Sequence, residues 1–298
     1  MAQRSRDIWA EWLLRRGTAG DKAGWVNFLH PVRDRVLENA QLSGGETLLD
    51  VGAGDGLIAI GALERMGEEG RVILSDVSQD LLDHSRSLAE QKGVAGRCRY
   101  LRAPATDLSA LGAASVDVVT TRSVLIYVRD KRRAFSEFHR VLKPGGRLSI
   151  FEPVASLRGT EPRGVFLGCD VTAVADLAEK VKAFYLRAQP RDSDPMHDFD
   201  ERDLIRLAEE AGFAEVHLDF KAVVARGNPP GWGEKAWDIL AKAAPNPLVP
   251  SLEEVAEREL SPEGAERLLA HLKPLVEAGR RTRRQASAYL RAVKLLWA

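Results

Sequence analysis

The chain has 298 residues, 45% hydrophobic and 29% charged, so neither a disordered nor a fibrous protein is indicated. Its 43 Lys and Arg residues balance 43 Asp and Glu residues; this removes the basic footprint of a nucleic-acid binder, and nucleic acid is not expected as a partner. The two cysteines, Cys98 and Cys169, have the spacing of neither a zinc site nor a disulfide framework. Since no apolar run reaches the ~18 residues of a membrane span, we expect a cytoplasmic protein with no metal site and no membrane contact.

The first 45 residues have helical periodicity. Residues 4–16 place Ile8, Trp9, Trp12 and Leu13 on one face and are followed by Gly17, which predicts an amphipathic helix that ends there. A second helix is expected over residues 31–41, before a Gly-Gly turn. We expect residues 1–45 to form an N-terminal helical cap.

From Glu46 onward, short apolar runs rich in β-branched residues alternate with amphipathic stretches of helical length. The expected strands are residues 47–51, 71–75, 97–101, 116–121 and 147–151, and the expected helices are 57–66, 79–91 and 131–142. Such alternation is typical of a parallel sheet whose right-handed crossovers place helices on both faces. We therefore predict an α/β fold, a doubly wound, Rossmann-like, mostly parallel sheet, with its core at residues 46–155.

Beyond Pro153 the regular alternation lapses twice, which predicts two helical insertions into the core. The expected segments are a helical insertion at 156–199, the core continued at 200–226, a helical lid insertion at 227–283 and the last core strand at 284–298. The first insertion should contain a long helix at 170–187, and the continued core should contain a helix at 201–211 and a strand at 214–222. We expect residues 286–295 to pair antiparallel beside residues 214–222.

The most informative stretch runs from an apolar strand into three alternating glycines and then a helix: Leu48-Leu49-Asp50-Val51-Gly52-Ala53-Gly54-Asp55-Gly56. Glycines suit a turn that needs positive φ or close approach of a ligand to the backbone. The dinucleotide fingerprint G-x-G-x-x-G would need its third glycine at Leu57, so the pyrophosphate-binding version matches poorly.

This turn resembles instead the first motif of class I methyltransferases that use S-adenosylmethionine (SAM), an acidic residue followed by G-x-G-x-G. The resemblance implies that Asp50 and the backbone of Gly52, Ala53, Gly54 and Gly56 face the methionine part of SAM.

Further positions recur in the order of this family. Asp76 ends the second strand, twenty residues after Gly56, where a carboxylate can accept hydrogen bonds from ribose hydroxyls, and Val77 follows it. Thr106 and Asp107 resemble the adenine-contact loop. Arg122 and Ser123 stand at the mouth of the fourth strand, where ligands of such sheets bind. The segment Leu142-Lys143-Pro144-Gly145-Gly146 is similar to a late motif of the family.

The resemblance implies a SAM-dependent methyltransferase that acts on a small organic acceptor by direct nucleophilic transfer and releases S-adenosylhomocysteine. In motif spelling the chain resembles the quinone-biosynthesis and natural-product branch. A methyltransferase of a protein or tRNA, a SAM-binding protein without methyl transfer, and an NAD-dependent oxidoreductase are the alternatives. No D/N-P-P-Y/F/W follows the fourth strand, which argues against the amino-methylating nucleic-acid enzymes of this fold.

The candidates for a general base are Glu152, Tyr127 and His30, with His197 as a further histidine. Glu152 ends the fifth strand, and we expect it to face the crevice at the carboxyl ends of the strands. Whether a base is needed depends on the acceptor atom, which the sequence does not identify. Both a monomer and a homodimer remain open.

Overall fold

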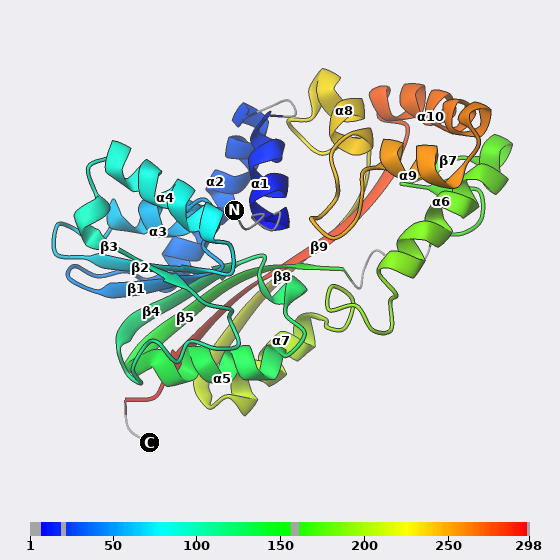
Figure 1. The fold of residues 1–298 in the computed structure, drawn as a ribbon. Coiled ribbons are helices and arrows are strands. Elements are labelled where there is room, and N and C mark those ends of the chain that lie inside the picture. Colours follow the sequence, from blue (N-terminus) through cyan, green and yellow to red (C-terminus); the bar gives the residue numbers. More distant parts are fainter. Residues whose placement is uncertain (1–6, 19–21, 156–160, 297–298) are drawn as a thin grey trace, which may run out of the picture. The chain divides into compact units, whose positions relative to one another are not determined.

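The computed structural model describes residues 7–18, 22–155 and 161–296 (Figure 1). The chain divides into two compact units. One contains the described residues of 1–29, 155–194 and 222–286, and the other contains 30–154, 195–221 and the described part of 287–298. Residues 4–6 of the first expected helix, and 156–160 at the start of the first expected insertion, lie outside the described residues.

A seven-stranded sheet with the order β3-β2-β1-β4-β5-β9-β8 organises the fold. Its strands are β1 (Thr47–Val51), β2 (Arg71–Asp76), β3 (Cys98–Arg102), β4 (Val116–Arg122), β5 (Leu142–Val154), β8 (Phe213–Arg226) and β9 (Thr282–Lys294). Strands β1 to β5 pair in parallel, and the last strands are antiparallel, so the predicted doubly wound, mostly parallel fold is confirmed. The last strand lies beside β8, as predicted.

Strand β5 begins earlier than the sequence indicates. Val116 pairs with Leu142 and Val118 with Arg147, so the intervening Lys-Pro-Gly-Gly segment bulges out of the β4–β5 ladder. We expected this segment to be a turn that precedes the strand. It is instead an irregularity inside β5, because pairing with β4 resumes on both sides of it.

Helices cover both faces of the sheet. On one face, α2 (Lys22–Ala40), α3 (Leu57–Leu63) and α4 (Gln79–Gln91) share a hydrophobic cluster with β1 and β2 (Figure 1). On the other face lie α5 (Lys131–Val141) and α7 (Glu201–Glu210). The predicted start of the second helix at Pro31 was wrong, since α2 extends nine residues further back with Pro31 inside it. Residues 30–40, expected in the N-terminal cap, contribute Val32, Val36, Leu37 and Ala40 to the sheet's own core.

The first unit has a separate hydrophobic core. Its elements are α1 (Ile8–Thr18), β6 (Val165–Phe166), β7 (Cys169–Asp170), α6 (Ala175–Ala188), α8 (Ala236–Ala241), α9 (Leu252–Glu259) and α10 (Pro262–Glu277). Phe166, Trp237 and Leu268 are among the side chains of one buried cluster. The helix predicted from residue 170 begins at Ala175, because a short hairpin and a 3-10 turn precede it. Helix α1 passes Gly17 and ends one residue later.

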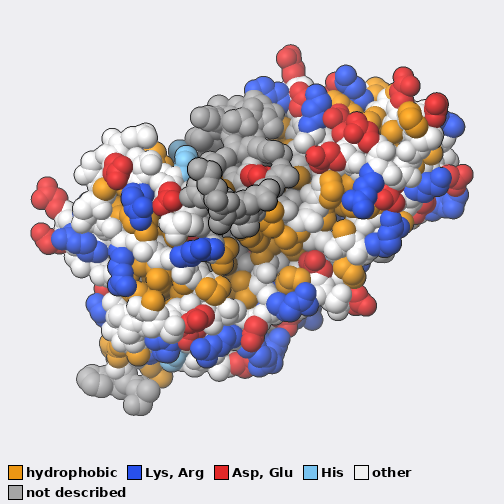
Figure 2. Space-filling model, in the orientation of Figure 1, with side chains coloured by type: hydrophobic (Ala, Val, Ile, Leu, Met, Phe, Trp, Pro, Cys, Tyr) orange, Lys and Arg blue, Asp and Glu red, His pale blue; other side chains and the backbone are white. Residues whose placement is uncertain are grey.

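Acidic and basic side chains are interspersed on the face shown in Figure 2, in keeping with the balanced composition. Within the described ranges, every helix is too short or too polar to cross a membrane.

Candidate cofactor site at the carboxyl end of the parallel strands

The turn after β1 needs its glycines for reasons internal to the protein. Gly52 has φ +66°, and a Cβ there would lie 2.4 Å from Cγ2 of Val124. Gly56 has φ +83°, and its Cβ would meet Ile60 and Ser85 at 3.0 and 3.3 Å. L side chains rarely adopt such φ values. Ligand approach, the reason expected from the sequence, is therefore not required to explain either glycine.

Asp50 is buried beneath this turn. One carboxylate oxygen accepts a hydrogen bond from the Thr120 hydroxyl at 2.9 Å and the other accepts one from the Ala59 amide at 3.2 Å. Burial raises the pKa of Asp50 to about 7, against the lowering effects of Thr120 and of the nearby Arg122 charge. These contacts fix the start of α3 against β4, and the contact with the methionine part of SAM that the resemblance implies stays a prediction.

Asp76 connects the glycine turn to the end of β2. Its Oδ2 accepts a hydrogen bond from the Gly54 amide at 2.9 Å, and its Oδ1 accepts one from the Ser78 amide at 2.9 Å. The Ala53 amide donates to the Ser75 carbonyl, which ties the same turn to β2 a second time. Val77, the next residue, is 44% exposed. The end of β2 thus presents an oriented carboxylate beside an apolar surface.

The loop after β3 is held by a carboxylate that sequence reasoning missed. Glu137 of α5 is buried, accepts a hydrogen bond from the Leu108 amide at 2.7 Å, and forms an ion pair with Arg140. The Arg140 guanidinium lowers the pKa of Glu137. An i, i+3 Glu–Arg pair on a helix is a common surface pattern, so the sequence contained no sign that this pair is turned toward the loop.

In the same loop, Asp107 is exposed. Its Oδ1 accepts a hydrogen bond from the Ser109 amide at 3.1 Å, and the hydrogen bonds from Ser109 lower its pKa. Thr106 is half-buried, and its carbonyl accepts a hydrogen bond from Arg133. The contact of Asp107 with adenine stays a prediction.

Glu152 lies where the sequence indicated, at the end of the central part of β5, but its surroundings differ from the expectation. It is fully buried, and its oxygens accept hydrogen bonds from the amides of Val124, Leu125 and Ile126 at 2.8, 2.8 and 3.1 Å. Burial raises its pKa to about 7, although these three donors favour the charged form. This geometry suits a residue that positions the loop after β4 and does not suit the open general base we expected.

That loop begins with an unusual backbone conformation. Ser123 has φ +56°, a region that non-glycine residues seldom occupy, and its amide donates to the Phe151 carbonyl at 2.8 Å. Arg122, half-buried at the end of β4, lies near enough to Asp50 to lower that residue's pKa. Strained residues held by surrounding contacts concentrate at functional sites.

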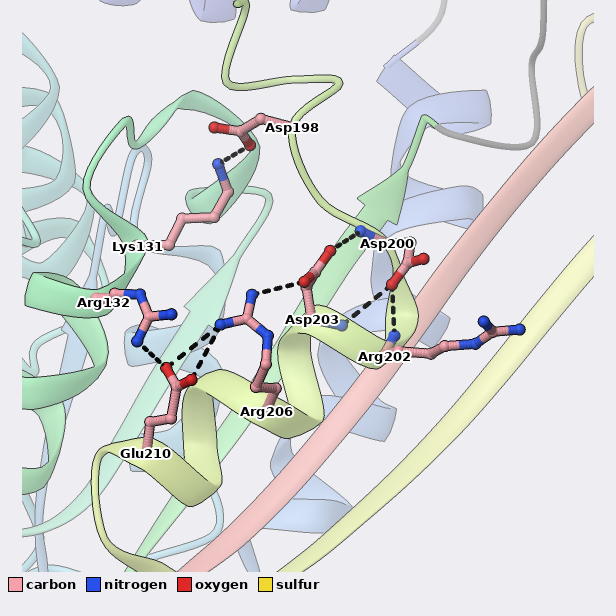
Figure 3. Close-up of polar contacts among 8 residues, drawn as sticks. All are labelled: Lys131, Arg132, Asp198, Asp200, Arg202, Asp203, Arg206 and Glu210. Carbon is pink, nitrogen blue, oxygen red and sulfur yellow. Dashed lines mark hydrogen bonds and ion pairs between the residues drawn. The ribbon is translucent and has the colours of Figure 1, made fainter. Parts of the chain in front are cut away.

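Lys131 fixes the other end of the loop. It is 6% exposed, and its ammonium donates to the carbonyls of Val128 at 2.9 Å and Pro195 at 3.0 Å and pairs with Asp198. Figure 3 shows this pair beside the contacts that join α5 to α7, including Arg132 with Glu210. The loop after β4 is thus anchored by a buried carboxylate at its start and a buried ammonium at its end.

The remaining candidate bases come from separate elements. His30 is half-buried on α2, Tyr127 is half-buried at the end of the 3-10 turn Leu125–Tyr127, and His197 is half-buried before α7. The roles of His30 and Tyr127 as general bases stay predictions.

Comparison with known proteins gives one family match: residues 49–150 match the model described as a methyltransferase domain. Ubiquinone/menaquinone biosynthesis C-methyltransferase UbiE of Vibrio cholerae is 31% identical over 185 residues, which cover 58% of this chain and 65% of that protein. The chain therefore spans less than two thirds of the length of this relative.

Solved structures share the fold at lower identity. Phosphoethanolamine N-methyltransferase 2 of Haemonchus contortus, in complex with S-adenosylhomocysteine, has a TM-score of 0.53 at 18% identity, covering 89% of this chain and 52% of that one. The [4+2]-cyclase SpnF has a TM-score of 0.54 at 20% identity, covering 93% and 86%. Residues 49–150 of this chain are therefore similar to a methyltransferase domain, on a fold that these solved structures share.

Proposed function

We propose that the protein transfers a methyl group from SAM to a small organic acceptor. The observation that carries the proposal is the orientation of the Asp76 carboxylate by the amides of Gly54 and Ser78. Asp76 lies at the carboxyl end of β2, and ligands of this fold bind at the carboxyl ends of the strands. The match of residues 49–150 to the methyltransferase domain family supports it.

The described residues fit SAM. The amides of Gly54 and Ser78 orient the Asp76 carboxylate, and a carboxylate is an acceptor suited to the hydroxyls of a ribose. The exposed Val77 offers an apolar surface beside it for a purine ring. The turn at Gly52, Ala53 and Gly54 follows directly on β1 and would face the amino-acid part, with Gly56 starting the next helix.

When bound, SAM supplies an electrophilic methyl group attached to a sulfonium. The protein's contribution is to hold the acceptor in line with that group and to exclude water, and such positioning can contribute ~7–11 kcal/mol. In our proposal the loop from Ser123 to Val128, fixed by Glu152 and Lys131, performs part of this positioning. Glu152 acts through the loop backbone, and Tyr127 on the same loop is the better placed candidate for contact with the acceptor.

A small acceptor is supported by the balanced charge of the chain and by its likeness to an enzyme named for C-methylation in quinone biosynthesis. We also propose a cytoplasmic location, in keeping with two free cysteines. The role of residues 227–283 as a lid stays a prediction from the sequence.

The test uses methyl-labelled SAM with the purified protein and three separate acceptor pools: metabolite extract, total protein and total tRNA. The proposal predicts label in the metabolite pool, with loss of that label in the Asp76→Asn variant. Label confined to protein or tRNA would move the acceptor to a macromolecule. SAM binding without transfer to any pool would contradict methyl transfer.

A further inference from the structure

Strand β8 forms one edge of the sheet. Among the described residues it has a strand neighbour, β9, on one side only, so a row of backbone N–H and C=O groups faces outward along a strand of 14 residues. Exposed edges of this kind add strands from other chains unless proline, a bulge or a run of like charge protects them. The sequence of β8 has no proline, and its charged side chains, Glu215, Asp219, Lys221 and Arg226, include two of each sign.

The two faces of β8 differ in chemistry. Val216, Leu218 and Phe220 alternate with charged or ionisable residues that point to the other face, because successive side chains of a strand do so. Residues 219 to 222 are all exposed, and Phe220 remains 40% exposed. Neither face is therefore covered along this stretch, and an apolar row lies beside the open edge.

The polar face makes few contacts within the chain. Asp219 pairs with Arg35 of α2 at 2.6 Å, and His217 lies 2.5 Å from Glu215 on the same strand. Both pairs are largely exposed, and such pairs contribute little to the stability of one copy. Because both pairs are solvent-exposed, their side chains are accessible to charges on an added strand.

We propose that β8 pairs antiparallel with β8 of a second copy, about a two-fold axis at Leu218. In this register Glu215 lies opposite Lys221 of the second copy, and His217 lies opposite Asp219. On the apolar face Val216 lies opposite Phe220, and Leu218 meets its own copy. The two-fold axis repeats each unlike pair, as an isologous interface requires.

Neighbouring registers are less favourable. An axis at His217 would place Glu215 opposite Asp219, and an axis at Asp219 would place two aspartates together; like charges directly opposite destabilise a sheet. An axis at Phe220 would keep Asp219 with Lys221 but leave Glu215 opposite an alanine. The charges of β8 therefore select Leu218 as the centre.

Charge exchange tests the interface in the full chain. Light scattering over a range of concentrations should show a dimer for the parent. Lys221→Glu places two like-charged pairs in the dimer and should weaken it roughly tenfold or more, and adding Glu215→Lys should restore it. Arg226→Glu reverses an exposed charge on β8 beyond the paired segment and should have little effect. A parent that is monomeric at all concentrations, or a double variant that stays dissociated, would overturn the proposal.

Cysteine cross-linking tests the register, in a Cys98→Ser background because Cys169 is buried. Leu218→Cys alone should form an intermolecular disulfide under mild oxidation. Val216→Cys and Phe220→Cys should each fail alone and cross-link when the two variants are mixed. Cross-linking of Val216→Cys or Phe220→Cys with itself, or none at Leu218→Cys, would overturn the register. Circular dichroism confirms that each variant is folded.

Discussion

The carboxylate of Asp76 and the backbone amide of Gly54 are joined by a hydrogen bond of 2.9 Å, although 22 residues separate them. This contact fixes the glycine turn after β1 against the end of β2. A carboxylate held in this way is oriented before a ligand arrives, which reduces the entropy lost when the ligand binds.

Gly52 should tolerate no side chain while Val124 remains valine. Gly52→Ala would place Cβ at 2.4 Å from Val124 at an unfavourable φ, and we expect a loss of about 2–4 kcal/mol in the free energy of unfolding. In a Val124→Ala background the steric part disappears and a loss of about 1 kcal/mol should remain. Urea denaturation of the four proteins measures this coupling. Equal losses in both backgrounds would show that Val124 is not the obstacle.

Glu152 should make stability depend on pH. Its pKa in the folded protein is about 7, above the ordinary 4.5, so the folded state retains the proton to higher pH than the unfolded chain does. The contribution of this group to stability therefore falls as pH rises from about 4.5 to about 7. Asp50, with its pKa also raised to about 7, adds a slope of the same sign.

Glu152→Gln removes one of these two titrations. The slope of unfolding free energy against pH should become shallower between these limits, while overall stability falls by about 1–3 kcal/mol because an amide has only one acceptor oxygen for three donors. Denaturation at a series of pH values measures both effects. An unchanged slope would exclude Glu152 as the titrating group.

Replacing Lys131 should destabilise the protein more than replacing Asp198, its partner in the ion pair. Lys131 is nearly buried, with two carbonyl acceptors besides the carboxylate, whereas Asp198 is one third exposed. Lys131→Met leaves those acceptors unsatisfied, and a loss of about 3 kcal/mol is expected; Asp198→Asn should cost less. Arg202 on α7 is exposed, and Arg202→Met therefore serves as the control (Figure 3). Similar losses for all three variants in thermal denaturation would contradict the difference in burial.

The regular elements were predictable where local signals agreed. Strand β1 has the predicted bounds because its apolar run is followed at once by a glycine. Helix α4 has the predicted bounds because Ser78 caps its N-terminus. The start of α2 was predicted at Pro31 because proline, which lacks an N–H, is common in the first turn of a helix. The helix in fact begins at Lys22 and continues through Pro31. The hairpin of β6 and β7 has strands of two residues, too short to show a period.

The site could be located from the sequence, but its contacts could not. Asp76 lies at the end of β2, as expected, because strand and glycine turn are local features. The partners of Glu152 lie 26 to 28 residues away on another loop and depend on the pairing of β4 with β5. A carboxylate at a strand end has the same sequence signature whether it faces a ligand or a loop backbone.

The central claim is that Asp76 binds the ribose of SAM, and calorimetric titration with S-adenosylhomocysteine tests it most directly. The parent should bind, and Asp76→Asn should bind at least roughly thirtyfold more weakly, since one charged acceptor of two hydroxyls is lost. Asp83→Ala removes a partly exposed carboxylate from α4 and should bind like the parent. No binding by the parent, or equal binding by a folded Asp76→Asn variant, would contradict the claim.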